Sequence, residues 1–221
     1  DFGRPANIWE YQAKEIGTYE EEADYTFTAK VTSKALYDAI GRTATEYPNW
    51  RVSIDGRTTE YDGSDLNANK TDDNQDFLQK ALGTAEGDRT GNGVVTEVYV
   101  DGTDRKVDIS VTHYYAAEVY EVNEDDGTIT LSPFYGPADR NDEFEATSFE
   151  EDEVVMYSFA DNEIQSVYAA ELLEGEVTRV RVNDNSDNEG DYFIADGTTY
   201  NYNHTTDKKE RLTTENVNNN V

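Results

Sequence analysis

An oxygen-rich loop is the clearest candidate in the sequence for metal chemistry. Residues 183–191 read Asn-Asp-Asn-Ser-Asp-Asn-Glu-Gly-Asp, which places carboxylate and amide oxygens on both sides of one glycine. Ca²⁺ prefers oxygen ligands of this kind in flexible loops. The candidate ligands occupy alternating positions: Asn183, Asn185, Asp187, Glu189 and Asp191. We predict weak, roughly millimolar Ca²⁺ binding here. The alternative is a solvated polar turn, because the spacing fits an EF-hand only loosely and no helical pattern flanks the loop.

The residues needed for common catalytic sites do not form a recognisable pattern. The sequence contains no P-loop, dinucleotide fingerprint, nucleophile elbow or zinc-protease motif. His113 and His204 are the only histidines, which argues against a histidine-based metal site or triad. His113 ends a strand-like segment, where a structural histidine in the core or at its rim is typical. Asp and Glu total 48, so choosing any one pair as a glycosidase site has no basis. We expect a protein that is not an enzyme.

Aromatic side chains raise the alternative of a sugar-binding platform. The candidates are two residues near the amino terminus, one at residue 50 and two in a strand-like segment: Trp9, Tyr11, Trp50, Tyr114 and Tyr115. The competing interpretation is that these rings are core, because aromatic side chains bury large areas and dominate the interiors of small domains.

Composition limits the partners and the location. Lys and Arg total 18 against 48 Asp and Glu in 221 residues, a net charge of −30. This balance argues against nucleic acids, whose phosphates need Lys and Arg, and against anionic membrane surfaces. No stretch of about 18 apolar residues predicts a membrane span. The absence of cysteine fits a cytosolic protein or a bacterial surface protein without disulfides. The chain opens at Asp1 without a visible signal peptide, and we expect a mature or excised segment.

The elements that would position these residues are mostly strands. The chain is folded despite its charge, since it holds 16 Tyr, 8 Phe and 2 Trp. Apolar and polar residues alternate over most of the length, and Asp-Gly pairs supply the positive φ of hairpin turns. Three hairpins are predicted, with a fourth connection at Ala160–Glu163: Glu97–Val100 with Val107–Val111, Val119–Val122 with Thr128–Leu131, and Tyr192–Ala195 with Thr198–Tyr202.

Two short helices are predicted, both in the first half. Ser33–Ile40 has a candidate N-cap at Ser33 and is followed by Gly41. Asp72–Leu82 has an acidic start that suits the helix dipole. We therefore predict a mainly β protein of antiparallel sandwich or barrel-like modules. Residues 1–105 form a mixed α+β module and residues 106–221 an all-β module, although a hairpin crosses that boundary.

Several segments resemble a region that recurs in large cell-surface proteins of Firmicutes carrying S-layer homology domains. The likeness lies in these segments: Asp1–Ala6, Trp9–Tyr11, Lys14–Tyr19, Asp24–Gly41, Val154–Tyr157, Ile164–Val167, Gly175–Val180 and Ala195–Tyr200. The S-layer homology motif itself is not seen, so this segment is not expected to anchor the protein to the cell wall. The resemblance implies an exposed module at the cell surface with a scaffold role, and it carries over no active-site residues.

These observations favour a structural component of a bacterial cell-surface layer or extracellular filament. Such a component would associate with itself or with neighbouring surface-protein modules, since edge strands can pair between copies. The alternative is an adhesion module that binds a glycan or a host protein, which exposed aromatic residues would favour. Both functions place the chain outside the cell, without membrane insertion and with Ca²⁺ as the one candidate cofactor.

Overall fold

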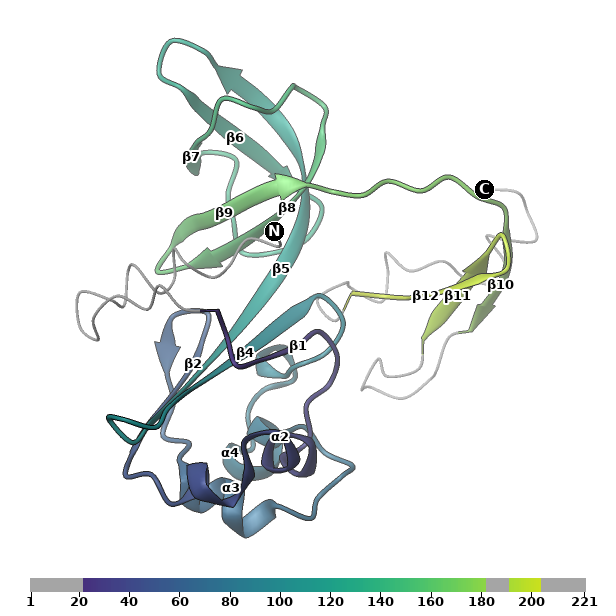
Figure 1. Cartoon of the computed structure of the whole chain (residues 1–221). Helices are drawn as coiled ribbons and strands as arrows, with labels where there is room; N and C mark the ends of the chain where they lie inside the picture. Colours follow the sequence, from purple (N-terminus) through teal and green to yellow (C-terminus); the bar gives the residue numbers. More distant parts are fainter. Residues whose placement is uncertain (1–21, 182–190, 204–221) are drawn as a thin grey trace.

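The computed structural model describes residues 22–181 and 191–203, and the fold is mainly antiparallel β with short helices. Two sheets are present in these residues (Figure 1). The mainly β class predicted from the sequence is confirmed. The first part of the chain contains these elements: β1 Tyr25–Phe27, α2 Ser33–Thr45, β2 Asn49–Ile54, β3 Arg57–Thr58, α3 Gly63–Asn69, α4 Phe77–Leu82, the 3₁₀ turn η1 Glu86–Asp88 and β4 Val94–Asp101.

The second part contains strands alone in the residues that the structure describes. They are β5 Lys106–Asn123, β6 Thr128–Pro133, β7 Glu143–Glu145, β8 Val154–Ala160, β9 Glu163–Ala169, β10 Val177–Arg181, β11 Tyr192–Ala195 and β12 Thr198–Asn201. The boundary placed near residue 105 falls in the turn between β4 and β5.

One long strand, β5, connects the two halves of the larger sheet. Its first eight residues pair with β4 on one side, and the first six of them run parallel to β2 on the other. From Tyr114 onward the same strand pairs with β8, and from Ala117 also with β6. His113 and Tyr114 therefore stand where β5 exchanges one set of neighbours for another. In Figure 1, β5 runs from the end that carries the helices to the end that carries β6–β9.

The three helices cover one face of the first half of this sheet. Val107, Ile109 and Val111 alternate with polar residues along β5 and are fully buried on the helix side. Leu36 of α2, Leu66 of α3 and Phe77 of α4 complete the same core. The apolar residues at every second position of the strand thus pack against the apolar face of each helix in one buried layer.

A second core lies between β5, β6, β8 and β9. Its buried members are Ala117, Val119, Ile129, Leu131, Val155, Tyr157 and Ile164. Both cores depend on residues of β5, so the strand is shared by two apolar clusters rather than belonging to one.

The predicted hairpins are confirmed, and the helices differ in detail from their prediction. β4 pairs with β5, β5 with β6, β8 with β9 and β11 with β12 in antiparallel register. The first helix extends four residues beyond Gly41, across a kink where that glycine has φ 71°. The predicted helix from Asp72 begins only at Phe77, because Asp76 is its N-cap.

The helix α3 was not predicted. Gly, Ser and Asn are weak helix formers, and residues 62–76 read as an oxygen-rich stretch. Asp62 nevertheless caps the helix, with its side chain accepting from Ser64 and Asp65 backbone N–H groups, while Asp65 accepts from the N–H of Asp62. Leu66 then anchors the helix in the first core. Among the described helices, none is long and apolar enough to cross a membrane.

Candidate interaction surfaces

His113 is a buried structural residue, with a fully buried side chain at the junction within β5. Its Nδ1 lies 2.8 Å from Oδ2 of Asp55, its backbone N–H donates to Oδ1 of the same carboxylate, and its Nε2 lies 3.1 Å from the carbonyl oxygen of Arg89. Both ring nitrogens face acceptors, so the arrangement favours the doubly protonated imidazolium. Burial alone would lower the pKa of His113, but the hydrogen bond and charge of Asp55, with smaller contributions from Arg89 and Asp88, raise it above its usual value.

The alternative of an aromatic platform is tested for three of its five candidate rings, and these three do not lie together on one exposed surface. Trp50 is half-buried, with its ring centroid 6.3 Å from that of Tyr61, and Tyr114 is buried. Tyr115 lines a surface hollow, described below. Trp9 and Tyr11 lie outside the described residues. Of the three candidate rings that the structure describes, Tyr115 alone reaches a candidate binding surface.

The predicted calcium loop falls almost wholly outside the described residues. Asn183, Asn185, Asp187 and Glu189 belong to that part of the chain, whereas Asp191 is described and buried. Within residues 22–181 and 191–203, no group of three or more His, Cys, Asp or Glu side chains is arranged to hold a metal ion. Calcium binding by the loop stays a prediction.

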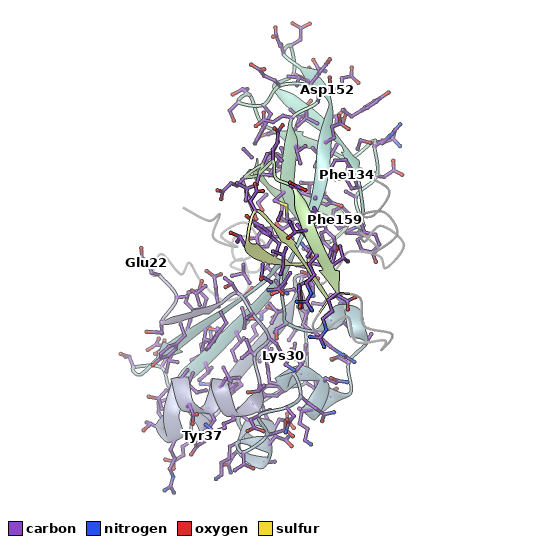
Figure 2. All side chains as sticks on the ribbon, turned by 90° about the vertical axis from the view of Figure 1, so that its right-hand side faces the viewer. Glu22, Lys30, Tyr37, Phe134, Asp152 and Phe159 are labelled. Atoms are coloured by element: carbon purple, nitrogen blue, oxygen red, sulfur yellow. The ribbon has the colours of Figure 1, made fainter. Side chains whose placement is uncertain are left out.

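An aromatic hollow of about 620 Å³ opens at the end of β6. Its lining consists of Tyr115 and the whole turn from Pro133 to Arg140. Phe134 is 58% exposed and Tyr135 is 45% exposed, although both are large apolar side chains. Figure 2 places Phe134 in the upper half of the molecule, away from the helix that carries Tyr37.

The turn that forms this hollow is fixed by contacts beneath it. A Cβ atom at Gly136, which has φ 133°, would collide with the hydroxyl of Tyr157 and with the ring of Tyr115. The Tyr157 hydroxyl accepts from the backbone N–H of Ala138 at 3.4 Å and donates to the carbonyl oxygen of Tyr135 at 3.5 Å. The backbone of the turn therefore lies directly on two aromatic rings of β5 and β8.

Arg140 borders the same surface. Its guanidinium lies 5.0 Å from the ring centroid of Tyr120, which is 53% exposed, and one of its N–H groups donates to Oγ of Ser132 at 3.1 Å. A cation held over a ring and by a hydroxyl keeps a defined position at the surface. The hollow thus combines exposed rings with a fixed guanidinium.

A second apolar surface belongs to the small sheet formed by β10, β11 and β12, here called the C-terminal sheet. The pairing register puts Val177 and Val180 of β10 beside Ala195 and Phe193 of β11, and Phe193 beside Tyr200 of β12. The Phe193 and Tyr200 rings stack with centroids 5.3 Å apart. No residue within these three strands is fully buried. The sheet therefore has an apolar face that is only half covered.

The segment leading into this sheet extends its apolar surface. Leu172 and Leu173 are 68% and 65% exposed. Leu173, Val177, Phe193 and Tyr200 line a hollow of about 320 Å³ on the apolar face.

Sequence reasoning missed both surfaces. The rings of Phe134 and Tyr135 stand in Pro133-Phe-Tyr-Gly-Pro137, where two prolines and a glycine predict a turn rather than a strand. Large aromatic residues inside a turn do not belong to the buried face of a strand or helix. Their place in the turn is therefore the sequence signal that they are exposed. The half-covered face has no such signal, because Val177–Val182 and Tyr192–Ala195 read as ordinary strands.

Comparisons of the chain with protein-family models, with curated proteins and with solved structures give no match. The fold and its two surfaces therefore define the class: an acidic, mainly β protein with one helical layer and two exposed apolar regions.

Proposed function

We propose that this chain is a structural module of a bacterial cell-surface layer or extracellular filament, and that it assembles with a second copy through the apolar face of the C-terminal sheet. The observation that carries the proposal is that no element among residues 22–181 and 191–203 covers this face, whose strands hold no fully buried residue. A sheet that is hydrophobic on one face is stable when that face is buried against another element.

The charge of the molecule favours a second copy as the covering element. At a net charge of −30, two copies repel each other at most approaches. The register places only uncharged residues on this face: Val177, Val180, Phe193, Ala195, Thr198 and Tyr200. Arg179 and Arg181 lie on the opposite face, where the Arg181 guanidinium stands 5.9 Å from the Tyr192 ring centroid. The strand residues of this face carry no charge, but Glu171, Glu174 and Asp196 also line its hollow, so salt that screens these carboxylates should favour the contact between two copies.

The geometry of a symmetric dimer follows from these facts. Two three-stranded sheets packed face to face would form a sandwich about 10 Å thick between sheets. The contact would use the same residues from both copies, as in a two-fold interface. Edge strands such as β9 and β10 then offer further pairing sites for growth into a layer or filament.

An extracellular location and a non-catalytic role are part of this proposal. The resemblance to surface proteins of Firmicutes, the absence of cysteine and the acidic composition support the location. The proposal assigns no catalytic residue.

Two adjacent threonines provide a matched test. Thr198 and Thr199 are both exposed, but they lie on opposite faces of β12, with Thr198 on the apolar face. The chain has no cysteine, so a single engineered one reports on its own contacts. We expect Thr198→Cys to cross-link two copies under mild oxidation at least about tenfold faster than Thr199→Cys, because the proposed contact holds position 198 of both copies at the interface and leaves position 199 on the outer face.

Light scattering after size exclusion completes the test. The unmodified chain is expected to form dimers or larger species as its concentration rises from about 10 µM to about 1 mM. This should occur most readily at about 0.5 M salt, where charge repulsion is screened. Equal cross-linking of the two variants, or a monomer at every concentration with and without millimolar Ca²⁺, would overturn the proposal.

A further inference from the structure

The aromatic hollow carries an inference that is independent of assembly. We propose that Tyr115 and the turn from Pro133 to Arg140 form a binding site for a neutral glycan, with the Phe134 and Tyr135 rings as stacking surfaces and Arg140 as a hydrogen-bond donor. This site lies on β5 and β6, and none of its residues belongs to the C-terminal sheet.

The size of the hollow favours a small ligand over a protein. Its volume of about 620 Å³ lies within the range of roughly 300–1,000 Å³ that is typical of small-molecule sites. A stable protein interface needs about 800 Å² from each partner. One turn with a few exposed rings supplies less than that, so a host protein is the weaker candidate.

The side chains match the two-sided chemistry of a sugar ring. A pyranose presents C–H groups on one face and hydroxyls around its edge. Exposed aromatic rings such as Phe134 and Tyr135 suit the first, and a fixed guanidinium with adjacent carboxylate and backbone groups suits the second. Tyr115 adds part of its aromatic ring to the lining, beneath Gly136.

The hollow is formed before any ligand arrives. Tyr157 holds the turn from below through Ala138 and Tyr135. At the far end, the Asp142 carboxylate accepts from the N–H of Asp139 at 2.7 Å, and the N–H of Asp142 donates to the Asp139 carbonyl at 3.0 Å. A preorganised site loses less conformational entropy on binding, which matters for weakly binding ligands such as sugars.

Charge selects a neutral ligand. The lining contains one cation, Arg140, and one anion, Asp139, so its own formal charges cancel. The rest of the chain carries a large negative charge, which repels an anionic glycan as it approaches. The Arg140 guanidinium is already engaged with Tyr120 and Ser132, so it is better suited to donating one hydrogen bond than to neutralising a charged group.

The test is titration of the full chain with defined oligosaccharides. Cellohexaose, maltohexaose, mannohexaose and chitohexaose serve as neutral probes, and a heparin-derived hexasaccharide serves as the anionic probe. Binding is followed by calorimetry and by saturation-transfer NMR at concentrations up to about 5 mM. We expect at least one neutral probe to bind and the anionic probe to bind at least about tenfold more weakly or not at all.

Three variants locate the site. Phe134→Ala and Tyr135→Ala should each raise the dissociation constant about tenfold, because each removes a stacking surface. Tyr25→Ala is the matched control, since it also removes an exposed aromatic ring but lies on β1, outside the hollow, and it should leave the dissociation constant within about twofold. All three substitutions are at exposed positions, so the variants are expected to fold, which far-ultraviolet circular dichroism checks.

Three outcomes overturn the glycan site: no neutral probe binds, binding is unchanged by Phe134→Ala and Tyr135→Ala, or the anionic probe binds best. None of them bears on assembly, which the Thr198→Cys and Thr199→Cys pair measures separately at the other sheet.

Discussion

His113 and Asp55 form the most enclosed charged contact in the described part of the chain. Asp55 lies in the turn after β2 with φ 45°, a conformation that Asp tolerates better than most residues. From this position it accepts both the backbone N–H and the ring N–H of His113. The sequence showed the histidine and the Asp-Gly turn separately. Their contact, between residues 58 positions apart, exists because β2 lies parallel to β5.

The His113 pair predicts a dependence of stability on pH. The pKa of His113 is raised in the folded chain above its usual value of 6.5. Its contribution to the free energy of unfolding is therefore fully present below about pH 6.5 and is lost as pH rises through the folded-state pKa. Urea unfolding of the unmodified chain between about pH 6 and pH 9 should show stability falling with pH in this window.

Asp55→Asn is the matching variant, since Asn also tolerates the left-handed conformation. It should cost about 3 kcal/mol at pH 6 by removing the carboxylate that stabilises the buried imidazolium. Without that carboxylate, the fall in stability between about pH 6.5 and pH 9 should disappear. The same slope in both proteins would show that another group is responsible.

At the scale of the elements, two aspartates cap neighbouring helices in different surroundings. Asp76, almost fully buried, caps α4, and its carboxylate accepts from the N–H of Leu78 at 2.9 Å and from both the N–H and the hydroxyl of Thr90. The Thr90 hydroxyl in turn accepts from the N–H of Val31 at 2.7 Å. Asp76 thus joins a helix start to the segment before β4, whereas Asp62 caps α3 at the surface.

These two caps predict different costs of substitution. Asp62→Ala should lower the free energy of unfolding by about 1 kcal/mol, the usual value of an exposed N-cap. Asp76→Ala should lower it by about 3 kcal/mol, because it also leaves the buried polar groups of Thr90 without an acceptor. Chemical denaturation of both variants at pH 7 measures the difference. Equal losses would mean that the Thr90 contacts add nothing to the cap.

At the scale of the whole molecule, β5 contributes buried residues to both cores and so links them. Val111 belongs to the first core and Val119 to the second, yet both are buried residues of one continuous strand. Unfolding of one core exposes the strand on which the other depends. We therefore expect the part built on β5 to unfold in a single cooperative transition.

Val111→Ala and Val119→Ala test this expectation. Each should cost about 2 kcal/mol by removing buried methyl groups and leaving a small cavity. Unfolding can be followed by tryptophan fluorescence, to which Trp50 beside the first core contributes, and by circular dichroism. Each substitution should shift the same transition with both probes. Two separate transitions, each moved by only one substitution, would instead support a division near residue 105.

The sequence by itself determined the features that depend on near neighbours. Alternating apolar residues and Asp-Gly turns predicted the hairpins, since strand pairing across a tight turn is a local property. The charge balance also follows from the sequence alone, because it requires only a count of residues. Its argument against nucleic acids stays a prediction. The short helix α3 was missed because its residues have weak helical propensity, and burial of Leu66 in the first core, where α3 packs against α2 and α4, stabilises it.

Only the tertiary structure decided what is exposed. The sequence identified Tyr114 and Tyr115 as equivalent candidates, but alternation along β5 buries the first and turns the second toward the hollow. Phe134 and Tyr135 became candidates only when the turn was seen resting on Tyr157. The apolar face of the C-terminal sheet was likewise recognised only because no element in the described part of the chain packs over it. Burial depends on which elements pack together in space, and local sequence patterns do not encode those long-range contacts.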